Sequence, residues 1–336
     1  MRAGLYRARL PALRAPRAQG GGKLAALQRV LSRPALKLVT FTPTVPAEAR
    51  IGLLLGDGTV LDVAEAAAAT RLSLPFDPRD MLSLIAAGPA GRQALNRLDR
   101  AVSGRIGLDQ GKLLAPIPRP RKNVFCVGWN YLEHFEEGER IRASGQPLPE
   151  RPVFFSKAVT AVIGPYDPIP YDPNVTTMLD WEAELAVVIG KAGKNIPEEH
   201  AMAHVFGYTV INDVSARDLQ RAHGGQWHKG KSLDGTCPMG PAIVTADALD
   251  PNGLRVVTRV NGVIKQDSNT RHLYFKIPRL IAELSWGMTL EPGDVISTGT
   301  PAGVGFARTP PQFLQPGDLL ETEIEGIGVL RNRVVA

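Results

Sequence analysis

From residue 122 to the C-terminus, short apolar runs alternate with glycine, proline and aspartate. The runs span residues 123–127, 183–189, 207–211, 254–260, 294–297 and 320–325. Segments of this length and spacing are typical of strands joined by turns. A doubly wound sheet would instead place a long helical pattern between successive strands. We therefore expect an α+β fold whose larger part is a β-rich mixed sandwich or roll.

Residues 35–118 have a pattern of their own, in which strand-like runs at 36–41 and 51–55 precede a glycine-containing turn and two helical stretches. This pattern predicts a small N-terminal α+β subdomain. The proline-rich run at 116–121 cannot continue a helix or a central strand. We therefore place the domain boundary there and assign residues 119–336 to a second, catalytic domain. Within it, the spacing of apolar residues at 277–284 predicts one amphipathic helix.

The chain carries a formal charge of +6, and this charge is concentrated at its start. Residues 1–34 contain eight basic residues and no acidic residue, which leaves 31 basic and 33 acidic residues in the rest of the chain, a net charge of −2. The body of the protein therefore lacks the basic surface that nucleic-acid binding requires. We expect residues 1–34 to form a basic, disordered arm, with an organellar transit peptide as the alternative.

Two further features limit the class of protein. No run approaches the roughly 18 to 20 apolar residues that cross a bilayer, so we expect no membrane role. Cys126 and Cys237 are the only cysteines, which excludes CxxC motifs and a disulfide framework and favours a reducing compartment. We expect a cytoplasmic protein, or one of an organellar matrix if the arm is a transit peptide.

Two glutamates precede the apolar residues 186–189. Because side chains alternate along a strand, Glu182 and Glu184 share one face. At a solvated edge the pair would be unremarkable, but this apolar run is typical of a strand buried on both faces, where uncompensated charge is costly. A third carboxylate, Asp213, follows another apolar strand. Three carboxylates without thiolate or imidazole form a hard site suited to Mg²⁺ or Mn²⁺.

Five short motifs stand in the order found in a known family. They are Cys126-Val127-Gly128-Trp129-Asn130-Tyr131 followed by His134, the Asp-x-Glu-x-Glu strand at 180–184, Asn212-Asp213-Val214-Ser215-Ala216-Arg217-Asp218-Leu219-Gln220, Gly230-Lys231-Ser232-Leu233-Asp234-Gly235, and Thr298-Gly299-Thr300-Pro301-Ala302-Gly303-Val304-Gly305. Over about residues 122–334 the chain resembles the fumarylacetoacetate hydrolase family. The resemblance implies that family's fold for the second domain, a small 2-oxo acid as substrate, and a homodimer.

The resemblance also implies roles for individual residues. Glu182, Glu184 and Asp213 would hold the metal, which chelates the dicarbonyl group of the substrate. Lys231 and Gln220 would contact the oxo and carboxylate oxygens of the substrate, with Arg217 nearby. The Thr300 region would donate hydrogen bonds to the substrate carboxylate. Trp129 stands where relatives often have Arg or Leu, so we expect its side chain to border the substrate.

His134 and Glu137 are three residues apart and would face each other on a helical turn, where the carboxylate can orient the imidazole. The alternative is an ordinary surface histidine next to acidic residues. The resemblance instead implies that this His and Glu lie on a mobile segment that closes over the substrate and activates water. The sequence thus predicts a metal-dependent hydrolase that cleaves a C–C bond of a 2,4-dioxo acid such as an acylpyruvate or fumarylpyruvate. The alternatives are an isomerase, decarboxylase or hydratase of a 2-oxo-heptenedioate-type acid in aromatic catabolism, and a non-catalytic binding protein.

Overall fold

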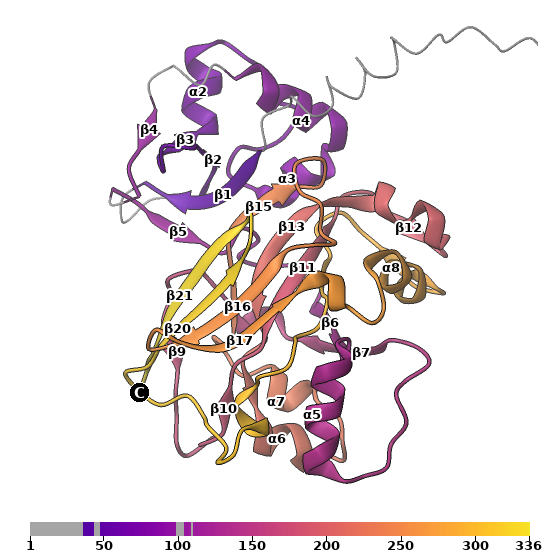
Figure 1. Cartoon of the computed structure of the whole chain (residues 1–336). Coiled ribbons are helices and arrows are strands. Elements are labelled where there is room, and N and C mark those ends of the chain that lie inside the picture. The colour runs from indigo at the N-terminus through magenta and orange to yellow at the C-terminus, as the bar shows by residue number, and fades with distance from the viewer. Residues whose placement is uncertain (1–35, 44–47, 99–103, 109) are drawn as a thin grey trace, which may run out of the picture. The chain divides into compact units, whose positions relative to one another are not determined.

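A computed structural model describes residues 36–43, 48–98, 104–108 and 110–336. The arm predicted for residues 1–34 lies outside these ranges. Residues 35–336 form one compact unit, in which most strands belong to a 12-stranded and a 5-stranded sheet (Figure 1). The predicted β-rich α+β fold is therefore confirmed.

The large sheet has the strand order β4-β3-β2-β1-β15-β13-β11-β19-β6-β7, with β5 paired to β1 and β8 to β15. Its strands are β1 (Lys37–Thr42), β2 (Arg50–Leu54), β3 (Val60–Asp62), β4 (Arg105–Ile106), β5 (Lys112–Leu114), β6 (Val124–Gly128), β7 (Val153–Lys157), β8 (Val162–Ile163), β11 (Ala183–Ile189), β13 (Val205–Asn212), β15 (Cys237–Thr245) and β19 (Val295–Ser297). β11 is central and pairs antiparallel with both β13 and β19. Every residue of β11 is buried, as its unbroken apolar run predicts.

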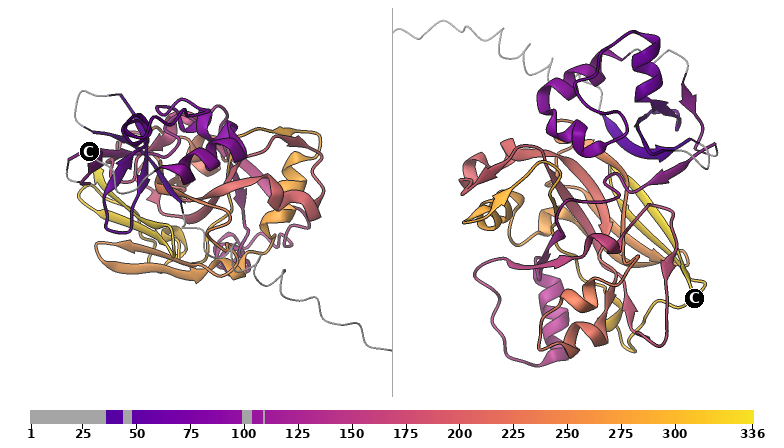
Figure 2. Two further views of the ribbon diagram at one scale, coloured as in Figure 1. Left: turned by 90° about the horizontal axis from the view of Figure 1, so that it is seen from above. Right: turned by 180° about the vertical axis from the view of Figure 1, so that it is seen from behind.

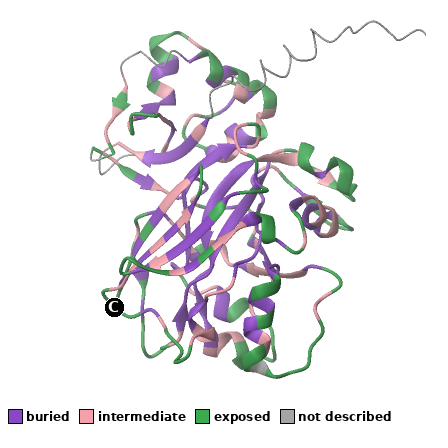
Figure 3. Cartoon of the chain, viewed as in Figure 1, coloured by how far each residue is buried: buried purple, intermediate pink, exposed green. Residues whose placement is uncertain are grey.

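The smaller sheet packs against β11, β13 and β15 of the large sheet. Its order is β17-β16-β20-β21-β9, with β9 (Ile169–Pro170), β16 (Arg255–Val260), β17 (Val263–Asn269), β20 (Leu319–Ile324) and β21 (Gly328–Val335). Leu185, Val187 and Val210 meet Val256 and Ile324 in the core between the sheets, which is the buried centre of the unit (Figure 3). Two short pairs complete the strands, β10 (Leu179–Asp180) with β14 (Ser215–Ala216) and β12 (Gly193–Lys194) with β18 (Thr289–Leu290).

The N-terminal segment contributes strands to the large sheet, because β1 pairs with β15 through Leu38 and Ile243. Its helices are α2 (Val63–Ala69), α3 (Met81–Ala86) and α4 (Gly88–Arg97), and the side chains of Asp62 and Asp80 cap the first two. The segment shares one hydrophobic cluster with the large sheet. The domain boundary at residues 118 and 119 stays a prediction.

Three helices gather at the opposite end of the unit from this segment (Figures 1 and 2). They are α5 (Leu132–Arg142), α6 (Arg217–Ala222) and α7 (His228–Lys231). The predicted amphipathic helix is confirmed as α8 (Ile277–Ser285). Short 3₁₀ turns span Val159–Ala161 (η1), Glu198–His204 (η2), Thr270–His272 (η3) and Gly305–Ala307 (η4). None of the helices in the described part of the chain has the length and apolar character of a membrane span.

Candidate metal and proton-transfer site

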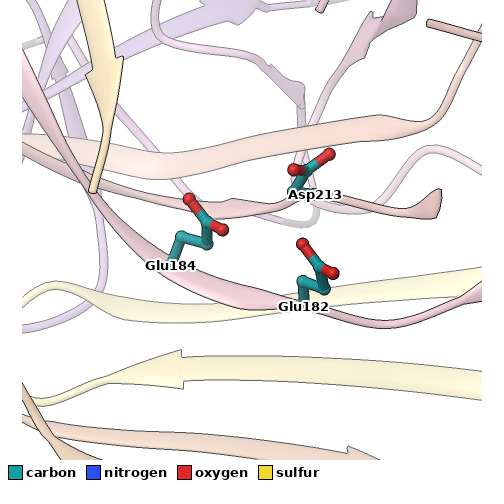
Figure 4. Close-up of side chains that lie close together, drawn as sticks. All are labelled: Glu182, Glu184 and Asp213. Atoms are coloured by element: carbon teal, nitrogen blue, oxygen red, sulfur yellow. The ribbon is translucent and has the colours of Figure 1, made fainter. Parts of the chain in front are cut away.

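Glu182, Glu184 and Asp213 bring their carboxylates together (Figure 4). Each offers a carboxylate oxygen within 4.8 Å of the others, and all three residues are buried. Strand alternation puts the two glutamates on one face, and pairing of β11 with β13 brings Asp213 beside them, where its N–H donates to the Glu182 carbonyl at 2.8 Å. The three predicted ligands therefore form a buried acidic triad that could hold a metal ion.

The charges around the triad are unevenly compensated. Burial raises the pKa of Glu184 to about 8, and the nearby carboxylates of Asp213 and Glu182 act in the same direction. Burial also opposes ionisation of Glu182, but Lys231 and Arg217 outweigh it and lower the pKa of that carboxyl. Glu184 accepts a hydrogen bond from Gly299 N–H at 2.9 Å and has no ion pair within the described ranges. A hard divalent cation would supply this missing positive partner, so the donor set fits Mg²⁺ or Mn²⁺.

Two buried lysines hold Asp213 from opposite oxygens. Lys231 Nζ donates to Asp213 Oδ2 at 2.8 Å and to Glu182 Oε2 at 2.7 Å. Lys157 Nζ donates to Asp213 Oδ1 at 2.9 Å and to the Val214 carbonyl at 3.0 Å, and it also donates to the Lys231 carbonyl. Lys157 was not predicted, because nothing in the local pattern of β7 distinguishes it. Its hydrogen bonds position both the Asp213 carboxylate and the backbone that carries Lys231.

α6 and α7 approach each other closely and supply the next part of the site. Gly230 permits the approach, since a Cβ there would lie 2.3 Å from the backbone nitrogen of Gln220. Arg217 Nε donates to Asp180 Oδ2 at 2.8 Å, and its Nη2 pairs with Glu182 Oε1 at 2.6 Å. Arg217 Nη1 donates to Gln220 Oε1 at 3.1 Å, which orients that amide. Arg217, the first residue of α6, therefore connects this helix to Glu182 of the acidic triad through an ion pair.

His134 and Glu137 form the hydrogen-bonded pair that their spacing suggested. Nδ1 of His134 lies 2.8 Å from Glu137 Oε1, and Gly303 N–H donates to Glu137 Oε2 at 2.9 Å. Both residues are only 8% exposed. Because a carboxylate only accepts hydrogen bonds, Nδ1 carries the imidazole proton and the lone pair of Nε2 is left available. The pair is thus arranged to accept a proton from a bound molecule.

Thr300 owes its hydroxyl orientation to Gln266, another residue that the sequence did not single out. Gln266 Oε1 accepts from Ala183 N–H and from Thr258 Oγ1, so its Nε2 must point toward Thr300. Nε2 donates to Thr300 Oγ1 at 2.8 Å and to the Pro301 carbonyl at 2.8 Å. With its oxygen already accepting from Gln266, the Thr300 hydroxyl keeps its own proton for another acceptor, and the residue lines a cavity.

These side chains border one cavity of about 320 Å³. Seven of the nine predicted site residues line it, and the other two, Asp213 and Glu137, contact lining residues from behind. The predicted border residue Trp129 also lines it, with φ of 55°, a left-handed conformation that is uncommon for a large side chain. The lining residues that were not predicted include Phe155, Arg221, Trp227 and Phe306.

Comparison with known proteins agrees with this arrangement. Residues 123–335 match the family described as Fumarylacetoacetate (FAA) hydrolase C-terminal. The chain belongs to the fumarylacetoacetate hydrolase family. Oxaloacetate tautomerase YisK of Bacillus subtilis is 43% identical to it, over 84% of this chain and 95% of YisK. Oxaloacetate tautomerase Fahd2a, mitochondrial, of Rattus norvegicus is 42% identical over 93% of this chain and 97% of the relative.

Solved structures of the fumarylacetoacetate hydrolase family extend the comparison. The fumarylacetoacetate hydrolase of Exiguobacterium antarcticum is 42% identical and has a TM-score of 0.76, covering 90% of this chain and 99% of its own. Maleylpyruvate hydrolase from Sphingobium sp. SYK-6, in complex with manganese(II) and pyruvate, is 32% identical with a TM-score of 0.69, covering 89% and 98%. The relatives are enzymes acting on small molecules, and they include tautomerases as well as hydrolases. The family prediction is confirmed, whereas the predicted C–C hydrolysis is not.

Proposed function

We propose that this protein is a divalent-metal-dependent tautomerase that interconverts the enol and keto forms of oxaloacetate. The observation that carries the proposal is the His134 imidazole, whose Nδ1 proton is held by Glu137 while the residue lines the cavity beside Lys231 and the acidic triad. Tautomerisation needs a positioned proton acceptor and stabilisation of negative charge on an oxygen, and it needs no attacking water. The names of the 43% and 42% identical relatives support the same chemistry.

The protein's side chains account for the proton movements. In the keto-to-enol direction, His134 Nε2 accepts a proton from C3 of the substrate, and negative charge moves to the oxygen on C2. Lys231 uses two of its hydrogens on Glu182 and Asp213, so the third can donate to that oxygen. The oxygen takes a proton from solvent and the imidazolium releases one, which balances the reaction. The reverse direction inverts each transfer.

The remaining contacts would orient the substrate. Thr300 presents its hydroxyl as a donor for the substrate carboxylate, with Gln220 and Arg217 on the facing helix. Mg²⁺ or Mn²⁺ held by Glu182, Glu184 and Asp213 would act as a Lewis acid that polarises the 2-oxo group. We propose Mn²⁺ or Mg²⁺ because three carboxylates form a hard donor set.

The experiment follows the ultraviolet absorbance of freshly dissolved enol-oxaloacetate as it converts to the keto form. We expect the protein with Mn²⁺ to accelerate the decay above a control of Mn²⁺ alone, EDTA to abolish the acceleration, and His134→Ala to remove it. The matched control Glu136→Gln, an exposed acid on the same helix, should keep it. Decay no faster than with Mn²⁺ alone would refute the proposal.

Hydrolysis of a 2,4-dioxo acid is the second candidate function. The same imidazole could deprotonate a water molecule, and the similarity to the maleylpyruvate hydrolase with bound manganese and pyruvate favours this chemistry. Product analysis with an acylpyruvate separates the two functions, because only hydrolysis releases two acids.

The assembly and the location are part of the proposal as well. The homodimer implied by the family resemblance is tested by light scattering of the purified chain. A cytoplasmic location and an organellar matrix remain alternatives, and imaging of the chain with and without residues 1–34 distinguishes them.

A further inference from the structure

Arg221 lines the site cavity but has no part in the chemistry proposed above. It follows Arg217 by four residues in α6, so the two side chains lie on the same side of the helix. Both guanidinium groups pack over the Phe306 ring, with Cζ 4.6 Å from the ring centroid for Arg217 and 5.6 Å for Arg221. One short helix thus presents two arginines to a single cavity.

The other cationic groups of the cavity are already committed to protein carboxylates. Arg217 pairs with Asp180 and Glu182, and Lys231 pairs with Glu182 and Asp213. Arg221 forms no ion pair with any acid in the described ranges, and it is exposed. Of the two arginines that line the cavity, Arg221 is therefore the one whose guanidinium group is not engaged by any carboxylate of the described residues and can pair with an incoming anion.

The charge balance of the site indicates what that anion would be. The site holds five buried carboxylates, Asp180, Glu182, Glu184, Asp213 and Glu137, and three buried cations, Lys157, Arg217 and Lys231. A divalent cation would bring the net charge of this set to zero, so a substrate with two carboxylates would need a further positive group. Arg221 supplies that group without drawing on the pairs that hold the triad.

The size and the walls of the cavity favour a small substrate. Trp129, Phe155, Trp227 and Phe306 contribute aromatic surface, and three of these rings stack edge to face, with centroids 5.0 Å apart for Trp129 and Trp227 and 5.2 Å for Phe155 and Trp227. At about 320 Å³ the cavity lies at the lower end of the range of small-molecule pockets, roughly 300 to 1,000 Å³. A short acid fits these walls better than a long one.

We propose that Arg221 binds the distal carboxylate of a dianionic substrate, so that the site selects short 2-oxo dicarboxylates over 2-oxo acids with an uncharged tail. This inference rests on the proposed function, because it assumes that the 2-oxo acid group of the substrate lies at the acidic triad. Arg221 acts as a specificity residue, since it touches the substrate away from the reacting carbon atoms.

The test measures binding of two probe acids in the presence of Mn²⁺ by isothermal titration calorimetry. The probes are 2-oxoglutarate and 2-oxopentanoate, which share the 2-oxo acid group and the chain length and differ in tail charge. The native chain should bind 2-oxoglutarate about tenfold more tightly, the value of one charge-assisted hydrogen bond reduced by solvent exposure. Arg221→Gln should remove this preference, whereas Arg221→Lys should keep part of it. The matched control Arg119→Gln, an exposed arginine outside the cavity, should keep all of it.

Equal binding of the two acids by the native chain, an undiminished preference in Arg221→Gln, or binding of neither acid would each overturn the inference. The enol-decay assay keeps the two proposals apart. Rapid tautomerisation whose KM for oxaloacetate is the same in Arg221→Gln and the native chain would refute the role of Arg221 alone. A preference that depends on Arg221, in a protein that does not accelerate tautomerisation, would refute the proposed function alone.

Discussion

Replacing Glu137 with glutamine should reverse the tautomer of His134. Gly303 N–H donates to one oxygen of Glu137, so the glutamine amide must keep its oxygen at that position. Its NH₂ group would then face His134 Nδ1, where the native carboxylate accepts a hydrogen bond. An amide NH₂ can only donate, so Nδ1 would become the acceptor and the imidazole proton would move to Nε2. The nitrogen proposed to accept the C3 proton would then have no lone pair.

The size of the effect follows from the alternative arrangement. Turning the amide around would restore the native tautomer but would set its NH₂ against Gly303 N–H. That choice leaves a buried donor unsatisfied, at a cost of about 1 to 3 kcal/mol, which corresponds to roughly a 5- to 150-fold excess of the wrong tautomer. Loss of the carboxylate also removes stabilisation of the imidazolium. We therefore expect kcat for tautomerisation to fall roughly 100- to 1,000-fold, within the range for general acid–base catalysis.

The assay combines enol decay with ¹⁵N chemical shifts of the His134 ring, which report the protonated nitrogen directly. Glu136→Gln is the matched control, because Glu136 is the exposed neighbour and its loss changes the helix charge equally. The control should keep the native rate and tautomer. Native activity in Glu137→Gln, or an unchanged tautomer with lost activity, would refute the reasoning.

Three further predictions follow from the buried charges and amides. In the metal-free protein the pKa of Glu184 is raised from 4.5 to about 8, so its stabilising contribution is complete below about pH 4.5 and is lost as the pH rises through about 8. Stabilisation by added Mn²⁺, measured by thermal unfolding, should grow over that interval, and a response that does not vary with pH would contradict this. Lys157→Met leaves Asp213 Oδ1 without its buried cation and should lower the free energy of unfolding in denaturant by about 3 to 5 kcal/mol. Lys112→Met, in a pair whose lysine is exposed, should lower it by less than about 1 kcal/mol. A similar loss of unfolding free energy in the two variants would show that the buried pair contributes no more to stability than the surface pair. Gln266→Glu cannot donate to Thr300 Oγ1, so the hydroxyl should turn toward the new carboxylate and KM should rise roughly tenfold. An unchanged KM would exclude Thr300 as a substrate contact.

The elements with strong periodicity could be predicted from the sequence. β11 follows its apolar run over Ala183–Ile189, and α8 buries all four apolar positions that the 3.6-residue spacing selected. Other features depend on pairing between distant segments. The antiparallel contact of β1 with β15 joins Leu38 to Ile243, and no local pattern specifies which strand a given strand will meet.

In the candidate site, too, some residues could be predicted from local sequence and others depend on contacts between distant segments. Residues inside the motifs, such as Glu182, His134 and Lys231, could be assigned roles before their positions were known. Lys157, Arg221 and Gln266 lie in ordinary surroundings in the sequence, and only the fold brings them against Asp213, the cavity and Thr300. Residues that act by positioning a motif residue, or that reach the cavity from outside the motifs, can therefore be identified only from the structure.

Titration of the protein with Mn²⁺ by calorimetry tests the acidic triad most directly. Glu184→Gln is the cleanest variant, because Glu184 has no lysine or arginine partner within the described ranges whose charge would be left unpaired. We predict a single site in the native chain, affinity lowered by roughly 100-fold or more in Glu184→Gln, and native affinity in Glu137→Gln. Equal Mn²⁺ affinity in the native chain and Glu184→Gln would contradict the assignment of Glu182, Glu184 and Asp213 as the metal ligands.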